Sequence, residues 1–489
     1  MEIQFAEFFR DELTITDIQS AMDKEEITSK QLVMYYLHQI AKYDQAGPHL
    51  HSILEINPDA IFIAEALDEE RKVSRARGPL HGIPILLKDN IETKDAMHTS
   101  AGTLALQNNL ANEDAFLVKQ LRQAGAIILG KTNMTELANG MASEMWAGYS
   151  TRGGQTVNPY GDRDLFVGGS SSGSTVAVAA NFTVGAIGTE TDASILSPAI
   201  QNSVVGIKPT VGLISRSGLI PFTYSQDTAG PIARTVTDAA FMLEVLAGID
   251  KDDPATFKSK YKPRQTYSHF LQKSGLAGTR IGVFTNASER YLQSEEHDEL
   301  LFQDVIHTLR KQGAILTEDV DIPSFHREWS WDVSFYELKH SLDNYLFQLP
   351  PHMPVHLVKE LIQFNEEFSE QTLKYGQDKL EARAKLPTAL KSSEYLNAKI
   401  EDLYFSQELG IDYALQKHQL DAIVFPSYIG STICAKAGYP SIAVPAGYMK
   451  NGRPFGVTFA GTAFSESTLI KLAYSFEQAT RHRKPPILK

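Results

Sequence analysis

Small hydroxyl-bearing residues are concentrated between Gly168 and Thr175, where the chain reads GGSSSGST. The spacing G-x-x-x-x-G is that of a phosphate-binding loop, but Ser174 stands where such a loop has the lysine that reaches the outer phosphates. Residues 169–173 also match the G-x-S-x-G elbow of a nucleophilic serine, although the strand required before an elbow is weak here. Taken alone, the loop favours a third interpretation, a glycine-rich turn that opens a helix.

Two other segments carry reactive side chains at the ends of apolar runs. Lys88 directly follows the run 83–87, and sites in α/β sheets form where strands end. A solvated surface lysine needs no function, but a buried lysine loses its proton more easily and can act as a general base. Ser194 lies between a strand predicted at 184–188 and a short helix predicted at 197–201. Backbone N–H groups beside a serine at such a turn can bind an oxyanion.

Strand-like and helix-like patterns alternate along most of the chain, which is typical of an α/β fold. Residues 1–70 and 325–420 are instead predicted to be helical, and Thr28 with Gln31 forms a capping box. No repeat or linker interrupts the chain, so we expect one large α/β domain. Its sheet is expected to be mixed and mostly parallel, with helices on both faces and a helical insertion. Strands are predicted at 83–87, 126–130, 184–188, 280–284, 314–316 and 421–426.

These patterns divide the chain into four expected segments of the one domain. They are a helical N-terminal segment at 1–70, a core with the reactive segments at 71–260, an α/β continuation with the helical insertion and substrate pocket at 261–425, and the last part of the core at 426–489.

The composition excludes several classes of protein. With 489 residues, of which 43% are hydrophobic and 21% charged, the chain is neither disordered nor fibrous. Its 46 basic and 59 acidic residues give a net charge of −13, so no basic surface for nucleic acid or anionic membranes is expected. The single cysteine, Cys434, cannot form an internal disulfide or a cysteine-rich zinc site. His49 and His51 have no third ligand at metal spacing, so we expect no metal and no cofactor.

The localisation expected from the sequence is cytoplasmic. Residues 1–7 carry acidic side chains where a secretory signal has a basic start and an apolar run. The most apolar stretch, 176–187, is too short to span a bilayer.

Three blocks of the chain together resemble the catalytic blocks of the amidase signature family. They are GIPILLKDN at 82–90, the serine loop at 168–174 and TETDAS at 189–194, and Ser194 follows Ser170 by 24 residues as in that family. The resemblance covers roughly residues 15–260 and 415–485. Further segments that resemble the family are residues 130–133 (GKTN), 206–210 (GIKPT), 230–235 (GPIART), 437–441 (AGYPS) and 444–447 (VPAG).

The resemblance implies the amidase signature fold and an amidohydrolase that works without metal or cofactor. It implies Ser194 as the nucleophile, Ser170 as a bridging serine preceded by a cis peptide bond, and Lys88 as the base. Ser171 and Thr189 would support these groups. The implied reaction breaks the C–N bond of a carboxamide through an acyl-enzyme on Ser194. The oxyanion hole would consist of the backbone N–H groups of Thr191, Asp192, Ala193 and Ser194.

The sequence around the nucleophile departs from the broad family pattern G-T-D-x-G-G-S-I-R. Here residues 188–196 read GTETDASIL, so Glu190 replaces the usual aspartate, Leu196 stands where arginine is common, and both glycines before the serine are absent. The ETD spelling, with GGQT at 153–156 and SQDTAG at 225–230, is more similar to the peptide-amidase branch. Ala193 carries a Cβ that disfavours positive φ, so the geometry of the oxyanion hole is expected to differ from that of the family.

We therefore expect an amidohydrolase of C-terminal peptide amides or small acyl amides, as a monomer or homodimer, with no nucleic acid or membrane partner. One alternative is the glutaminase subunit of a glutamyl- or aspartyl-tRNA amidotransferase, which normally carries the GGSIR spelling. Another is a binding homologue that lost turnover through Ala193. Trp329 and Trp331 either line a substrate pocket or pack in a core, and aromatic clusters more often pack.

Overall fold

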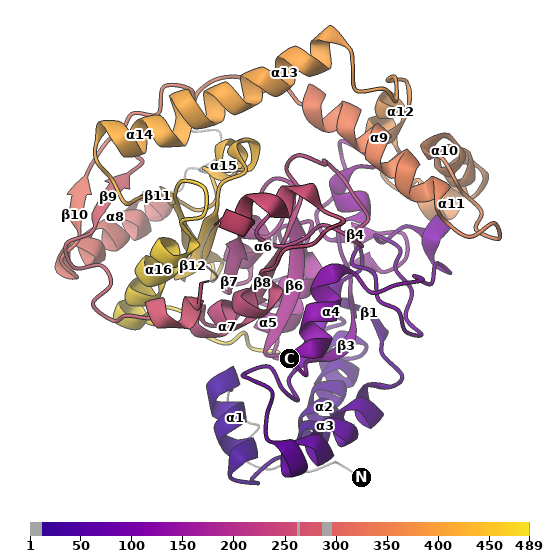
Figure 1. The fold of residues 1–489 in the computed structure, drawn as a ribbon, viewed down its shortest axis with the longest axis horizontal. Helices are drawn as coiled ribbons and strands as arrows, with labels where there is room; N and C mark the ends of the chain where they lie inside the picture. The colour runs from indigo at the N-terminus through magenta and orange to yellow at the C-terminus, as the bar shows by residue number, and fades with distance from the viewer. Residues whose placement is uncertain (1–11, 262–264, 286–295, 489) are drawn as a thin grey trace.

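One mixed sheet of 11 strands runs through the molecule, in the order β1-β3-β2-β6-β8-β7-β12-β13-β11-β9-β10 (Figure 1). The computed structural model describes residues 12–261, 265–285 and 296–488, so the acidic stretch 1–7 lies outside it. The strands are β1 (Ile53–Ile56), β2 (Pro84–Lys88), β3 (Ile127–Thr132), β6 (Gly185–Glu190), β7 (Val205–Lys208), β8 (Thr228–Ala233), β9 (Arg280–Val283), β10 (Ile315–Thr317), β11 (Ala422–Pro426), β12 (Ser441–Tyr448) and β13 (Pro454–Ala460), while β4 (Tyr149–Ser150) and β5 (Gly154–Gln155) form a separate pair.

All the strands predicted from the sequence are present, as β2, β3, β6, β9, β10 and β11. The strands β1, β7, β8, β12 and β13 were not predicted. β7, β8 and β12 contain glycine or proline, which are depleted in strands, and β1 lies in a stretch predicted to be helical.

The prediction of a mostly parallel sheet is wrong. β2 pairs in parallel with β3 and β6, and β9 pairs in parallel with β10 and β11. Every other neighbouring pair in this described sheet is antiparallel, and these pairs are the majority. The reason is that each unpredicted strand adds antiparallel pairs, such as the hairpin of β12 and β13, which needs no crossover helix.

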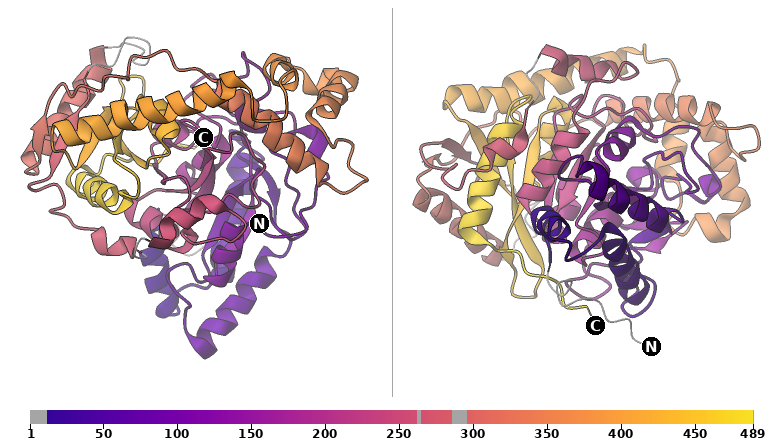
Figure 2. Two further views of the ribbon diagram at one scale, coloured as in Figure 1. Left: turned by 45° about the horizontal axis from the view of Figure 1, so that its top comes forward. Right: turned by 60° about the horizontal axis from the view of Figure 1, so that its bottom comes forward.

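Helices cover both faces of the sheet, as predicted (Figures 1 and 2). Every residue of β2, β3, β6, β7, β8 and β11 is buried, and successive side chains of a strand point to opposite faces, so neither face is open to water. The helices are α1 (Ile15–Asp23), α2 (Ser29–Gln39), α3 (Ala60–Ser74), α4 (Phe116–Gln123), α5 (Ser172–Ala179), α6 (Leu196–Gln201), α7 (Val236–Leu246), α8 (Glu296–Lys311), α9 (Asp332–Phe347), α10 (Val358–Glu367), α11 (Ser369–Thr372), α12 (Asp378–Ala384), α13 (Ser393–Leu403), α14 (Asp412–Lys417), α15 (Ser431–Ala437) and α16 (Glu466–Thr480). α2 begins with the predicted capping box of Thr28 and Gln31.

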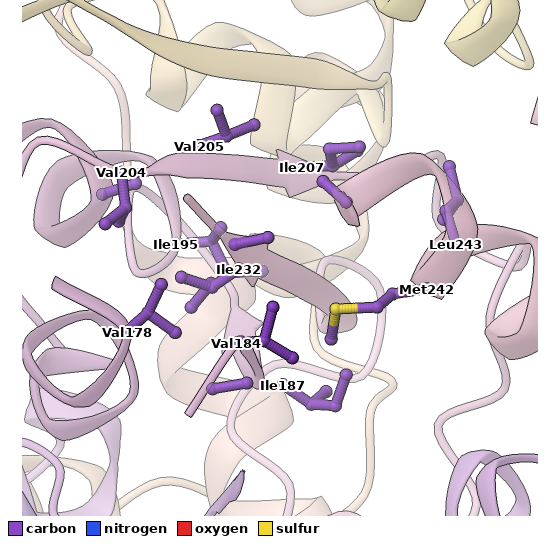
Figure 3. Packing of buried hydrophobic residues seen from close by; sticks show 14 of the residues in the cluster. Val178, Val184, Ile187, Ile195, Val204, Val205, Ile207, Ile232, Met242 and Leu243 are labelled. Atoms are coloured by element: carbon purple, nitrogen blue, oxygen red, sulfur yellow. The ribbon is translucent and has the colours of Figure 1, made fainter. Parts of the chain in front are cut away.

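The main core lies where β6, β7 and β8 meet α5 and α7 (Figure 3). Val178 of α5, Ile187 of β6, Ile207 of β7, Ile232 of β8 and Met242 of α7 are all buried there. Because these side chains fill the space between sheet and helices, the carboxyl end of β6 and the start of α5 are held at a fixed distance. Both are parts of the segments that carry the predicted site.

The helical insertion predicted at 325–420 is present between β10 and β11 and contains α9 to α14. In Figure 1, α9 to α14 form an arc of helices along one side of the sheet. Leu338 and Leu342 of α9 share a second apolar cluster with Leu106, Met134 and Ile220. This part of the insertion is therefore packed on the half of the molecule that carries β2 and β3, whereas Ala414 and Leu415 of α14 pack with Ile423 and Phe425 of β11.

Candidate active site

Lys88 is the last residue of β2, and Thr189 lies near the end of the neighbouring strand β6. The two strands are parallel, with Ile85 opposite Gly185, so their carboxyl ends meet at the same edge of the sheet. The chain after β6 makes the turn with Ser194 and enters α6. The sheet therefore places the Lys88 and Ser194 segments side by side.

Lys88 is fully buried and surrounded by oxygen atoms. Its Nζ lies 2.8 Å from Ser170 Oγ, 3.1 Å from Ser171 Oγ, 2.9 Å from Thr189 Oγ1 and 3.1 Å from the Thr189 carbonyl oxygen. Burial lowers the pKa of Lys88 to about 7, although the negative charges of Asp227 and Glu190 act in the opposite direction. A large fraction of Lys88 is consequently neutral near pH 7, as a general base must be.

The serine loop contributes two hydroxyl groups to Lys88 from the start of α5. The Gly169–Ser170 peptide bond is cis, as the resemblance implies. Ser171 Oγ donates to the carbonyl oxygen of Thr189 at 3.0 Å and accepts the Thr189 N–H at 3.2 Å. Its hydrogen is therefore engaged with Thr189, whereas the Ser170 hydroxyl has Lys88 as its neighbour.

Ser194 lies on the adjacent turn and is mostly buried. Its carbonyl oxygen accepts the N–H of Ser171 at 3.1 Å, which joins the turn to the serine loop. Its hydroxyl donates to the carbonyl oxygen of Asp192 at 3.4 Å. The structure thus brings Lys88, Ser170, Ser171 and Thr189 into direct contact, and it connects Ser194 to them through the backbone.

Glu190, which replaces the usual aspartate, supports the far end of this turn. Its buried carboxylate accepts the N–H of Ile195 at 2.7 Å and that of Leu196 at 3.0 Å. Burial raises the pKa of Glu190 to about 7, while Lys208 and the two N–H groups lower it. The longer side chain of glutamate therefore caps the N–H groups that open α6.

The four backbone N–H groups proposed as the oxyanion hole, those of Thr191, Asp192, Ala193 and Ser194, are available for a ligand. Within the residues that the structure describes, none of them donates to a protein acceptor. Ala193 has φ +60°, the left-handed conformation that glycine adopts readily and alanine does not. The turn thus has the backbone geometry of a glycine-containing turn in spite of its alanine.

Two polar residues at this site were given no role from the sequence. Asn90 Nδ2 donates to Thr189 Oγ1 at 3.0 Å, which orients that hydroxyl beside Lys88. Asp227 accepts the Thr191 hydroxyl at 2.5 Å. Both residues belong to segments that resemble the family, GIPILLKDN and SQDTAG, but no spacing rule in the sequence connects them to the serines. Only the folded sheet brings them there.

Other sequence candidates lie outside this cluster. Trp329 packs against a separate apolar cluster, as the packing interpretation predicts, whereas Trp331 is 43% exposed. Both rings flank the Lys436 ammonium, at 5.5 and 5.6 Å. His49 and His51 lie next to each other, but no group of three or more potential metal ligands occurs among the described residues. In the same part of the chain, no helix has the length and apolar character needed to cross a membrane.

Known proteins resemble the chain over nearly its whole length. The family model described as Amidase matches residues 31–470. A probable amidase of Arabidopsis thaliana is 42% identical over 97% of this chain and 91% of the relative. The native peptide amidase from Stenotrophomonas maltophilia has a solved structure with a TM-score of 0.93 and 43% identity, covering 99% of this chain and 100% of that one. A glutamyl-tRNA(Gln) amidotransferase subunit of Thermosynechococcus vestitus is 30% identical over 97% of this chain and 99% of the relative. The chain therefore belongs to the amidase signature family and is an amide-hydrolysing enzyme.

Proposed function

We propose that this enzyme hydrolyses C-terminal peptide amides through an acyl-enzyme on Ser194, with Ser170 as proton bridge and Lys88 as base. The observation that carries the proposal is the 2.8 Å contact between the buried Lys88 Nζ and Ser170 Oγ. A lysine with a pKa near 7 can accept a proton that an exposed lysine cannot. The choice of peptide amides is supported by the similarity to a peptide amidase at a TM-score of 0.93.

Acylation begins when Ser194 Oγ attacks the carbonyl carbon of the carboxamide. The Ser194 hydroxyl turns from the Asp192 carbonyl toward Ser170, gives its proton to Ser170 Oγ, and the Ser170 proton passes to Lys88 Nζ. The developing oxyanion accepts hydrogen bonds from the backbone N–H groups of residues 191–194. Removing one such donor typically raises a barrier by ~2.7–4 kcal/mol.

Collapse of the tetrahedral intermediate breaks the C–N bond. The proton on Lys88 returns through Ser170 to the leaving nitrogen, which departs as ammonia. Water then attacks the carbonyl carbon of the Ser194 ester and gives a proton through Ser170 to Lys88. The bond between the acyl carbon and Ser194 Oγ breaks, the carboxylic acid leaves, and the proton returns through Ser170 to Ser194 Oγ. One amide and one water give one carboxylic acid and one ammonia, and the three side chains return to their starting protonation states.

Ammonia release by the purified chain tests this function. The panel contains N-acylated dipeptide amides, the same peptides as free acids, glutamine and a short aliphatic amide. We expect ammonia from the peptide amides and none from the free acids. Ser194→Ala and Lys88→Ala should each lower kcat by about 10³-fold or more while both variants keep the circular dichroism spectrum and the cooperative unfolding of the folded chain. Undiminished activity in Ser194→Ala, or release from glutamine only once a partner protein is added, would overturn the proposal.

Covalent labelling separates an enzyme from a binding homologue. A fluorophosphonate should modify the wild type at Ser194, located by mass spectrometry of the digested protein, and Lys88→Met should react more slowly because the serine is no longer activated. A wild type that is neither labelled nor active on any amide of the panel would identify a binding homologue instead.

A further inference from the structure

The loop 222–227 contacts the turn that carries Ser194. Asp227, at the end of this loop, is mostly buried and accepts three hydrogen bonds. The hydroxyl of Thr191 donates to its Oδ1 at 2.5 Å, and the N–H groups of Phe222 and Thr223 donate to its Oδ2 at 2.7 and 2.9 Å. One carboxylate thus joins the loop to the first residue of the turn.

The sheet explains why these two residues meet. β6 and β8 are antiparallel, and their last pair is Glu190 opposite Thr228. Thr191 and Asp227 are the next residues outward on the two strands. Their side chains continue the connection at the point where the ladder of β6 and β8 ends, and Gln226 Nε2 adds a long contact to the Thr191 carbonyl oxygen at 3.4 Å.

The same loop is anchored on its other side to α9 of the helical insertion. The Ser225 N–H donates to Glu337 Oε2 at 2.7 Å, and Glu337 Oε1 accepts the Tyr395 hydroxyl at 2.9 Å and the Lys399 ammonium at 3.0 Å. Glu337 is buried, so these donors satisfy a charge that would otherwise be costly. The loop is therefore held to the turn through Asp227 and to α9 through Ser225.

We infer that Asp227 is a positioning residue for the nucleophile, because it holds the turn of residues 191–194 through Thr191 and joins that turn to α9. This inference rests on the proposed function. Glu190 supports the turn only from Ile195 onward and the Thr432 hydroxyl donates to Asp192 at 2.8 Å, so Asp227 is the carboxylate that holds the Thr191 side chain. Displacement of a reacting group by ~1 Å can cost about 10²-fold in rate.

Asp227 also acts on the base. The charged groups that act on Lys88 are Asp227, before β8, and Glu190, at the end of β6, and both raise the pKa of Lys88 against the effect of burial. Removing the charge of Asp227 would lower the pKa of Lys88. Since the base must be neutral to accept a proton, the acidic limb of the kcat/KM profile would then move to lower pH.

Steady-state kinetics of Thr191→Val, Thr191→Ser and Asp227→Asn on the best peptide amide test this inference. Valine keeps the shape of threonine but loses the hydroxyl, whereas serine keeps the hydroxyl. We expect Thr191→Val to lower kcat about 10- to 100-fold with KM within ~2-fold, and Thr191→Ser to stay within ~3-fold of the wild type. Asp227→Asn should lower kcat and move the acidic limb to lower pH.

Ser143→Ala is the matched control, because Ser143 makes a similar pair with Asp378 at 2.6 Å on the surface, and it should behave as the wild type. Melting temperatures identify any variant that does not fold, and the Thr191 pair decides the outcome if Asp227→Asn is unfolded. Equal kcat for the wild type and Thr191→Val, equal losses in Thr191→Val and Thr191→Ser, or an unmoved acidic limb in folded Asp227→Asn would overturn the inference. A wild type inactive on every amide would instead overturn the proposed function.

Discussion

Lys88 combines two properties that oppose each other in most proteins, full burial and an ionisable ammonium. The four surrounding oxygen atoms hold it in place, but a buried charge is costly, and its pKa falls to about 7 as a result. The feature that suits Lys88 to be a base therefore reduces the stability of the folded chain at neutral pH.

The contribution of Lys88 to stability depends on pH in a direction that can be derived. Between pH 7 and about pH 10.5 the unfolded chain holds a proton on Lys88 that the folded chain has released. Unfolding then takes up a proton, so the free energy of unfolding rises with pH by about 1.4 kcal/mol per pH unit from this residue. Below pH 7 both states are protonated, this slope vanishes and the cost of burial is present in full.

Urea denaturation of the wild type and Lys88→Met at several pH values between 7 and 9.5 measures this effect. We expect the free energy of unfolding of the wild type, relative to Lys88→Met, to rise across this range. Replacement of the exposed Lys119 by methionine is the control and should show no such rise. A difference between wild type and Lys88→Met that stays constant with pH would show that Lys88 keeps its proton when folded.

At the scale of elements, the turn between β6 and α6 is the part of the site most altered from the family pattern. Ala193 has φ +60°, so the steric cost of a Cβ at positive φ is present at this residue. The left-handed conformation costs an alanine about 1–2 kcal/mol. The carbonyl oxygen of Ala193 accepts the Ser197 N–H at 2.8 Å and so begins α6, which ties the conformation of the turn to that of the helix.

Substitutions at this position should follow the cost of positive φ. Ala193→Gly removes the Cβ, but glycine also gains entropy in the unfolded chain, about 0.4–1 kcal/mol. We therefore expect it to be more stable than the wild type by up to ~1.5 kcal/mol, with activity retained. Ala193→Val, β-branched at positive φ, should be less stable by about 2 kcal/mol or more. Melting temperatures and urea midpoints measure both, and a valine variant as stable as the glycine variant would contradict this account.

How much of each element could be predicted depended on its residues. Apolar runs such as 83–87 predicted their strands correctly, because burial on both faces leaves a continuous hydrophobic signal. TAGPIA in β8 gave no such signal, since glycine and proline are rare in strands. Lys88, Ser170 and Ser194 could be singled out from the resemblance, whereas the position of Asp227 opposite Thr191 follows only from the register of β6 and β8.

At the scale of the whole molecule, β8 and β7 join the two parts of the sheet, because they lie at the centre of the strand order. On one side are β1, β3, β2 and β6, which carry Lys88 and the turn of Ser194, and on the other are β12, β13, β11, β9 and β10. The prediction of a mostly parallel sheet was wrong partly because it did not include these two central strands. Gly230, the glycine of β8, weakened the strand signal in the sequence and also allows the neighbouring strand to approach.

Gly230 of β8 shows this requirement most directly. A Cβ at this position would lie 2.0 Å from the carbonyl oxygen of Ile207 in β7, which is backbone and cannot turn away. Gly230→Ala should therefore separate the two halves of the sheet and lower the free energy of unfolding by about 2–3 kcal/mol or more. Gly78→Ala is the control, since its Cβ would have nothing within 4 Å, and it should change stability by less than ~1 kcal/mol. Urea unfolding followed by circular dichroism measures both. If Gly230→Ala unfolded at the same urea concentration as Gly78→Ala, the contact between β7 and β8 would not limit the stability of the sheet.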